Sequence, residues 1–231
     1  MMKRKLSIIV LASLLSISTL SAQELAMSAT FAYESEYVFR GVQFADESFQ
    51  PAVDISYGDF YAGIWANEPI VDGVGFNNEI DFYTGYGFGL TDWLSADVGF
   101  TYYWFPEDPA SESYSREFYA GFAADVTFAP SVYFYYDVDL NGFTIQGSAG
   151  HSIPLSDTME NSTLDFGVYI AAVFFDTGSG ADYAYYGASL DWSYAFNENA
   201  AFSIGMRVSA TSLDDTRDAN CWWGATFSAG F

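Results

Sequence analysis

The sequence predicts an all-β protein, a transmembrane antiparallel up-and-down β-barrel of about 12 strands. Apolar residues alternate with polar or small ones along segments of roughly ten residues, the pattern of strands with lipid on one side and a polar interior on the other. A basic and then apolar N-terminus indicates export. An aromatic residue, Phe231, closes the last alternating segment.

The N-terminal segment has the order of a secretory signal peptide. Basic residues at positions 3–5 precede an uncharged run over 6–20, and a small residue, Ala22, follows it. The run is shorter than the roughly 20 residues that a membrane-spanning helix needs. We therefore expect residues 1–22 to be removed and residues 23–231 to form one barrel domain. A retained single-span anchor is the alternative.

Alternation along the remaining chain gives twelve candidate strands. The clearest spans 94–104, where every even-numbered residue is apolar or aromatic. The predicted strands lie near 27–39, 49–57, 60–67, 78–88, 94–104, 115–128, 131–139, 142–152, 163–175, 183–195, 200–210 and 221–231. Most connections expected outside the cell are longer than those on the periplasmic side, as in bacterial barrels. The short outer turn at 140–141 and the long inner connection at 154–162 are exceptions.

Aromatic residues stand near the predicted strand ends, where a membrane barrel has its interfacial girdles. They are Tyr37, Phe39, Trp104, Phe128, Trp192 and Tyr194. A soluble β-sandwich is the alternative fold, but it needs protected edges. We expect Phe231 to act as a signal to the barrel-assembly machinery, which a sandwich does not need.

Four short motifs resemble the TorF-like family, whose members are classed as outer-membrane porins. They lie at 37–41 (YVFRG), 60–65 (FYAGIW), 102–106 (YYWFP) and 117–121 (EFYAG). The resemblance covers most of the chain after the signal peptide and is most specific in the first half. It implies a barrel and a pore, and it carries over no substrate and no catalytic residue.

The charge of the chain favours cations over nucleic acids as partners. Removal of residues 1–22 leaves four arginines against 30 acidic residues, a formal net charge of −26. Such a charge repels nucleic-acid phosphates. It suits small cations, or a surface bridged by divalent ions to lipopolysaccharide. Cys221 is the single cysteine, so neither an intramolecular disulfide nor a cysteine metal site is available.

Catalytic motifs are missing from the sequence, so we expect no enzyme and no cofactor. His151 is the single histidine, and no nucleophile motif or glycine-rich phosphate loop accompanies it. Packing at the membrane interface explains His151 better than catalysis does. Asp214, Asp215 and Asp218 form an acidic cluster in the last outer loop. A calcium site is possible there, but the spacing does not match an EF-hand, and solvated loop charge is the preferred interpretation.

The phase of the alternation places most acids on the inner face of the barrel. Charged groups there avoid the free-energy cost of facing lipid. The predicted pore-lining residues are Glu34, Glu36, Asp54, Glu79, Asp81, Asp97, Glu117, Asp125, Asp137, Asp139, Asp165, Asp191, Arg40 and Arg207. Inward tyrosines are predicted to narrow the lumen, and their rings either stack on a sugar or nucleoside or plug the barrel. These tyrosines are Tyr83, Tyr103, Tyr119, Tyr133, Tyr135, Tyr169, Tyr183 and Tyr185.

Taken together, these patterns predict an outer-membrane, porin-like channel for passive diffusion of small, cationic or neutral solutes. Its expected surroundings are outer-membrane lipid and lipopolysaccharide. The alternative is a non-conducting structural or adhesive barrel whose outer loops bind a partner. The number of strands does not decide between them, because roughly eight strands give a filled interior and 16 or more an open channel.

Overall fold

The chain folds into strands joined by turns and loops, as the computed structural model shows. The structure describes residues 25–71, 73, 78–109, 113–155, 159–178, 180–213 and 219–231. Within these residues, no helix is long and apolar enough to cross a membrane. The predicted signal peptide (1–22) and the acidic cluster within 214–218 lie outside the described residues.

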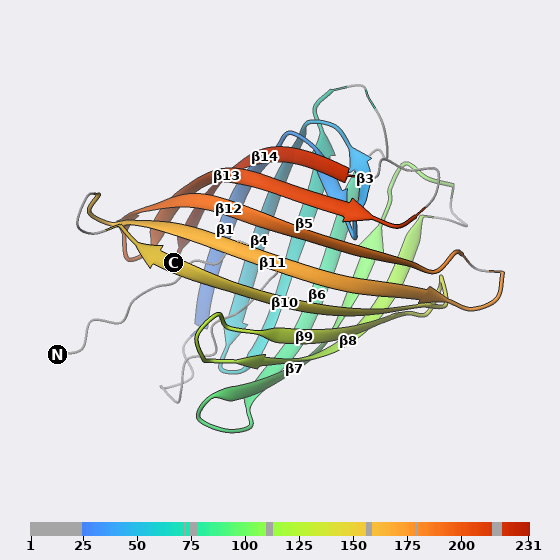
Figure 1. Ribbon diagram of the computed structural model, residues 1–231, viewed down its shortest axis with the longest axis horizontal. Helices are drawn as coiled ribbons and strands as arrows, with labels where there is room; N and C mark the ends of the chain where they lie inside the picture. Colours follow the sequence, from blue (N-terminus) through green and yellow to red (C-terminus); the bar gives the residue numbers. More distant parts are fainter. Residues whose placement is uncertain are drawn as a thin grey trace.

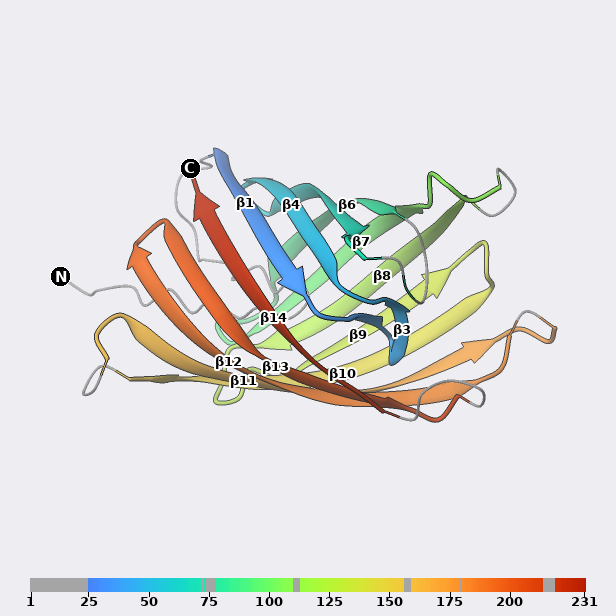
Figure 2. The same cartoon turned by 90° about the horizontal axis from the view of Figure 1, so that it is seen from above.

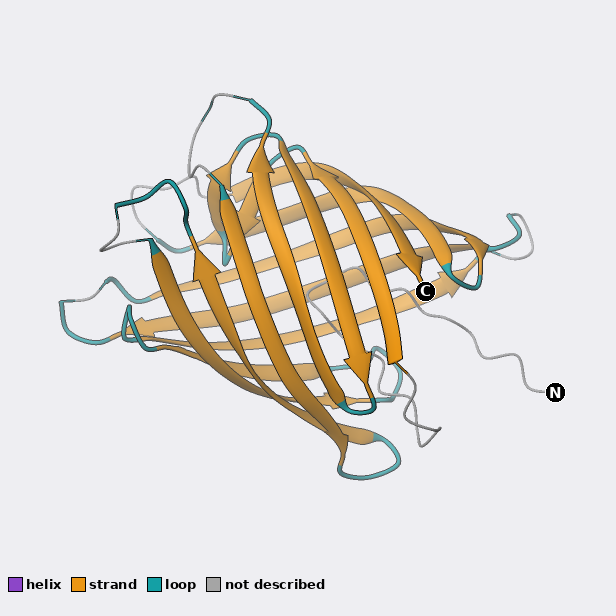
Figure 3. Cartoon of the chain, turned by 180° about the vertical axis from the view of Figure 1, so that it is seen from behind, coloured by secondary structure: helices purple, strands orange, loops and turns teal. Residues whose placement is uncertain are grey.

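Twelve strands, β1 and β4 to β14, close into one antiparallel barrel (Figures 1 and 3). The first six are β1 (Leu25–Glu34), β4 (Ser48–Tyr57), β5 (Phe60–Pro69), β6 (Glu79–Gly89), β7 (Leu94–Trp104) and β8 (Tyr114–Ala124). The others are β9 (Ser131–Asp137), β10 (Gly142–Pro154), β11 (Ser162–Phe175), β12 (Tyr183–Asn197), β13 (Ala200–Thr211) and β14 (Ala219–Gly230). The predicted fold class is confirmed.

Pairing between the first and last barrel strands closes the sheet. The register of β1 against β14 runs from Ser28 opposite Gly230 to Glu34 opposite Gly224. The backbone N–H of Phe231 donates to the carbonyl oxygen of Met27 at 2.8 Å, so the pairing continues past the end of β14. Closure matters in lipid because an open edge would leave backbone groups without hydrogen-bond partners. The assembly-signal role of Phe231 stays a prediction.

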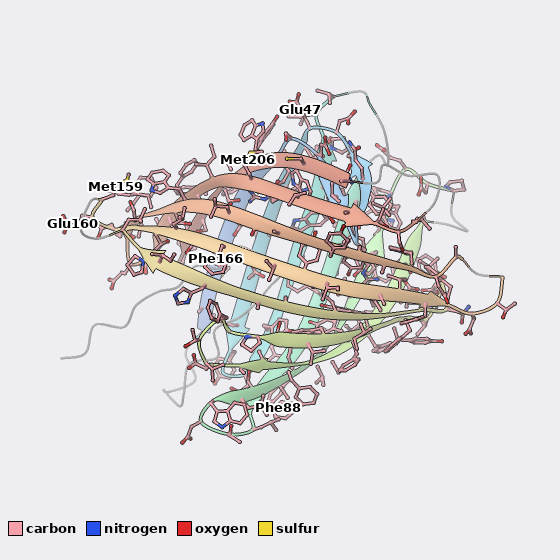
Figure 4. The ribbon with its side chains drawn as sticks, viewed as in Figure 1. Glu47, Phe88, Met159, Glu160, Phe166 and Met206 are labelled. Atoms are coloured by element: carbon pink, nitrogen blue, oxygen red, sulfur yellow. The ribbon has the colours of Figure 1, made fainter. Side chains whose placement is uncertain are left out.

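The two faces of the barrel have opposite chemistry. Large apolar side chains point outward and are exposed, such as Phe118 at 55% and Ile170 at 68%. Polar side chains of the opposite parity are buried, such as Glu117 at 1% and Ser209 at 0%. Figure 4 labels Phe88, Phe166 and Met206, which share the outward parity of their strands. A soluble sandwich would bury the apolar face instead, so that alternative is wrong.

A small hairpin interrupts the first predicted strand. Residues 27–39 were expected to form one strand, but β1 ends at Glu34, and β2 (Tyr37–Phe39) pairs with β3 (Val42–Ala45) in a separate two-stranded sheet. The turn between them has positive φ at Arg40 (50°) and Gly41 (81°), as a two-residue type I′ turn requires. Tyr37, predicted for the interfacial girdle, is therefore on this hairpin and only 8% exposed.

Candidate functional site

Most of the predicted pore-lining residues lie inside the barrel. Nine acids lie at inward strand positions: Glu34, Asp54, Glu79, Asp81, Asp97, Glu117, Asp137, Asp165 and Asp191. Arg207 lies inward on β13, whereas Arg40 reaches the interior from the turn of the β2–β3 hairpin. Glu36 is half-buried in the connection between β1 and β2. The pore-lining role of these residues stays a prediction.

Asp125 and Asp139 lie in turns, contrary to prediction, because their strands end earlier. β8 ends at Ala124, and Asp125 is exposed in the turn that follows. β9 ends at Asp137, whose carboxylate accepts hydrogen bonds from the backbone N–H groups of Asp139 (2.9 Å) and Leu140 (2.8 Å). An aspartate that hydrogen-bonds the backbone two residues ahead forms an Asx turn, which competes with strand pairing.

Asp139 instead forms an ion pair on the outer side of the barrel. Its Oδ1 lies 2.7 Å from Nη2 of Arg116. Arg116 has the outward parity of Phe118 on β8, and its side chain is 47% exposed. Hydrogen bonds from Arg116 hold the pKa of Asp139 below its ordinary value. This pair was not predicted, because the alternation assigned Asp139 to the interior.

The β2–β3 hairpin carries the first interior ion pair. In Figure 2 the hairpin, in blue, turns from the ends of β1 and β4 toward the opposite wall. Nη2 of Arg40 donates to both carboxylate oxygens of Glu117, at 2.8 and 2.7 Å. Tyr103 donates a further hydrogen bond to Glu117 at 2.9 Å. The Arg40 guanidinium also lies 5.1 Å from the centre of the Tyr135 ring, within the range of a cation–π contact.

A second interior ion cluster surrounds Arg207. Its Nη1 lies 3.0 Å from Oδ1 of Asp191, and its Nε lies 3.4 Å from Oε2 of Glu34. The indole N–H of Trp222 donates to the same Glu34 carboxylate at 2.9 Å. The cluster joins β1, β12, β13 and β14, which are consecutive around the barrel. It therefore ties together the strands on both sides of the β1–β14 closure.

Tyrosine hydroxyls hold several of the remaining inward acids. Tyr61 donates to Asp97 at 3.0 Å, and Tyr133 donates to it at 3.3 Å. Tyr83 donates to Asp54 in the same way. Hydroxyl donors satisfy a carboxylate without adding positive charge. This part of the interior is thus hydrogen-bonded yet contains acids that no described arginine neutralises.

Glycines at inward positions make room for these tyrosine rings. The ring of Tyr83 fills the space that a Cβ on Gly63 would need, and the ring of Tyr133 does the same at Gly121. The ring of Tyr119 likewise fills the space that a Cβ on Gly99 would need. Each glycine is on a strand next to that of its tyrosine. Sequence reasoning missed this function of the glycines, although inward glycines on strands adjacent to inward tyrosines were a usable signal.

Tyr61 and Gln146 are polar interior residues that sequence reasoning also missed. Tyr61 is 8% exposed, and its hydroxyl lies 2.5 Å from that of Tyr119. Gln146 accepts a hydrogen bond from Tyr185 at 2.7 Å. The alternation on β5 and β10 places both residues on the inner face. The prediction, however, named only charged residues and eight other tyrosines there.

One family, whose function is unknown, matches most of the chain. The family described as "Bacterial protein of unknown function (Gcw_chp)" matches residues 19–222. This match does not confirm the TorF-like label. No curated protein matches the chain.

Solved porin structures share the fold at low sequence identity. The structure of the KdgM porin has a TM-score of 0.59 and 11% identity, and the match covers 89% of this chain and 99% of that one. The KdgM porin in complex with disordered oligogalacturonate gives a TM-score of 0.58, with the same identity and coverage. The NanC porin gives a TM-score of 0.51 and 11% identity, covering 90% of this chain and 99% of that one. At such identity the likeness shows the fold alone.

Proposed function

The chain belongs to Gcw_chp, a bacterial family of unknown function, and we propose that it is an outer-membrane channel for passive diffusion of small cationic or neutral solutes. The observation that carries this proposal is the excess of carboxylates on the inner face of a closed barrel. Nine acids lie at inward strand positions, and the described interior arginines are Arg40 and Arg207. Among the described residues, three of the nine acids, Glu34, Glu117 and Asp191, pair with these arginines, so acidic charge is in excess.

The distribution of the charges supports cation preference. Arg40 pairs with Glu117, and Arg207 lies between Glu34 and Asp191. Among the described residues, neither arginine forms an ion pair with the other six inward acids, and several of these acids accept hydrogen bonds from hydroxyl groups. Low-dielectric walls focus the field of such charges into the lumen, where it raises the local concentration of cations.

A non-conducting barrel is the second candidate, and the filling of the interior favours it. The β2–β3 hairpin and the tyrosine rings occupy space inside the barrel, as the contacts of Arg40 and Tyr61 show. Such a barrel would act through its outer loops. The two functions differ in one measurable property, which is whether ions cross the folded protein.

Current through planar lipid bilayers tests the proposed function. Residues 23–231, refolded in detergent and checked for a heat-dependent gel shift, should produce stepwise increases in current in potassium chloride. The same preparation after heat denaturation is the control and should produce none. If the folded protein inserts into the bilayer and no steps appear, it is not a channel and the non-conducting alternative holds.

A further inference from the structure

The segment between β1 and β4 is a defined hairpin. Residues 35–47 are an insert between two barrel strands that pair directly with each other. β2 and β3 pair within this insert, and the positive φ angles of Arg40 and Gly41 form its turn. A two-residue type I′ turn matches the twist of a β-hairpin, so the tip has one preferred shape.

The tip of the hairpin touches the far side of the barrel. In the strand order, β9 lies opposite β1, and β8 is its neighbour. Arg40 contacts Glu117 on β8 and Tyr135 on β9. A Cβ added to Gly41 would lie 2.6 Å from the Cβ of Tyr185 on β12, so the backbone is packed against that strand. The hairpin thus crosses the interior from one wall to the other.

Burial shows that the hairpin is docked inside the barrel. Tyr37 is 8% exposed and Ala45 is 1% exposed. The Tyr37 ring lies 5.5 Å from that of Trp65 on β5, and its hydroxyl lies near Glu79 on β6. An outer loop extended into water would leave these side chains exposed. The contacts on β5, β6, β8, β9 and β12 therefore surround the hairpin on several sides.

We propose that the β2–β3 hairpin is the constriction of the channel and that the Arg40–Glu117 ion pair holds it in place. This inference rests on the proposed function. Glu117 is 1% exposed, so its loss would leave the Arg40 guanidinium in the interior without its partner. An unpaired buried charge is strongly unfavourable, and moving the hairpin tip into water relieves it. In a barrel of intermediate width, one displaced hairpin changes the free cross-section considerably.

Single-channel conductance of matched variants tests the inference. Glu117→Gln removes the charge of the interior pair with little change in shape. Asp139→Asn is the control, since it removes the acid of the Arg116 pair, which has the same 2.7 Å separation but lies outside the barrel. We expect Glu117→Gln to raise conductance about twofold or more, because the lumen of such a barrel is narrow. Asp139→Asn should conduct like the wild type.

Two further variants separate the hairpin from the effects of a single substitution. Replacing residues 36–46 by Asn-Gly joins β1 to β4 through a short turn and removes the hairpin while leaving Glu117 in place. It should give at least the conductance of Glu117→Gln. The charge swap Arg40→Glu with Glu117→Arg rebuilds the pair in reverse and should restore the wild-type conductance.

The possible outcomes distinguish this inference from the proposed function. Unchanged conductance in both Glu117→Gln and the hairpin deletion, with a conducting wild type, overturns the inference alone. A silent wild type with a conducting deletion variant supports the hairpin as the obstruction and contradicts an open wild-type channel. If the wild type and every folded variant are silent, both proposals are wrong.

Discussion

Two ion pairs on β8 have the same geometry and opposite surroundings. Arg116 and Glu117 are consecutive, so their side chains point to opposite faces of the sheet. Arg116 pairs with Asp139 outside the barrel, and Glu117 pairs with Arg40 inside it, each with an N–O distance of 2.7 Å. The side chain of Glu117 is 2% exposed, whereas that of Arg116 is 47% exposed. The N–O distance alone therefore does not show which pair contributes more to stability.

Burial determines what each pair does for the molecule. An exposed pair gains little, because water and salt screen it. A buried pair is strongly disrupted by the loss of one partner, since the other charge stays behind without compensation. The outer pair thus fixes a turn at the rim, while the inner pair fixes the position of an entire hairpin.

Trypsin should detect release of the hairpin through the bond between Arg40 and Gly41. Removing one partner of a buried ion pair costs about 3–5 kcal/mol. Since each 1.4 kcal/mol corresponds to a factor of ten, Glu117→Gln should raise the rate of cleavage after Arg40 by about 100-fold or more. Mass spectrometry of the peptides identifies this cleavage separately from cleavage at other arginines.

Asp139→Asn is the matched control for the protease experiment. It breaks an ion pair of equal length, but one that does not contact the hairpin, so cleavage after Arg40 should stay at the wild-type rate. Equal rates in Glu117→Gln and the wild type would mean that the interior pair does not hold the hairpin.

Two glycines with positive φ offer a smaller and independent test. Gly41 (φ 81°) is packed against Tyr185, whereas a Cβ on Gly178 (φ 91°) would meet nothing within 4 Å. Alanine at either position strains the backbone by about 1–3 kcal/mol. Gly41→Ala should also displace the docked tip and raise cleavage after Arg40 about tenfold. Gly178→Ala should leave that cleavage unchanged. Similar cleavage in both variants would show that close packing at Gly41 is unimportant.

The faces of the barrel were predictable from sequence because strand geometry has a period of two. If the side chain of Phe118 faces lipid, that of Glu117 must face the interior, because successive side chains point to opposite faces. Residues paired across neighbouring strands share a face, so the same assignment applies around the barrel. The even number of strands and the nine inward acids followed from this local rule. The structure confirms the twelve-stranded antiparallel barrel.

The hairpin was not predictable in the same way. Residues 37–39 alternate like a barrel strand, and the type I′ turn contains Arg40-Gly41 instead of the favoured Asn-Gly. Its docking depends on a contact between Arg40 and Glu117, which are 77 residues apart in the chain. The end of β9 was also missed, because an Asx turn at Asp137 overrides the alternation. The end of β8 was missed because Phe128 and Ala129, with φ angles of 69° and 37°, lie in the turn between β8 and β9. Long-range contacts and turn chemistry, unlike alternation, leave weak local signals.

The reversal potential under a potassium chloride gradient tests the central claim that interior carboxylates select the solute. At low salt we expect a reversal potential whose sign reports cation preference. The reversal potential should become smaller as salt rises, because salt screens charges over about 10 Å at 0.1 M. Asp54→Asn with Asp97→Asn removes two inward charges while keeping oxygen acceptors for the tyrosine hydroxyls, and it should move the potential toward zero. Asp125→Asn, at an exposed turn, should leave it unchanged. Anion preference, or none at low salt, would contradict the account.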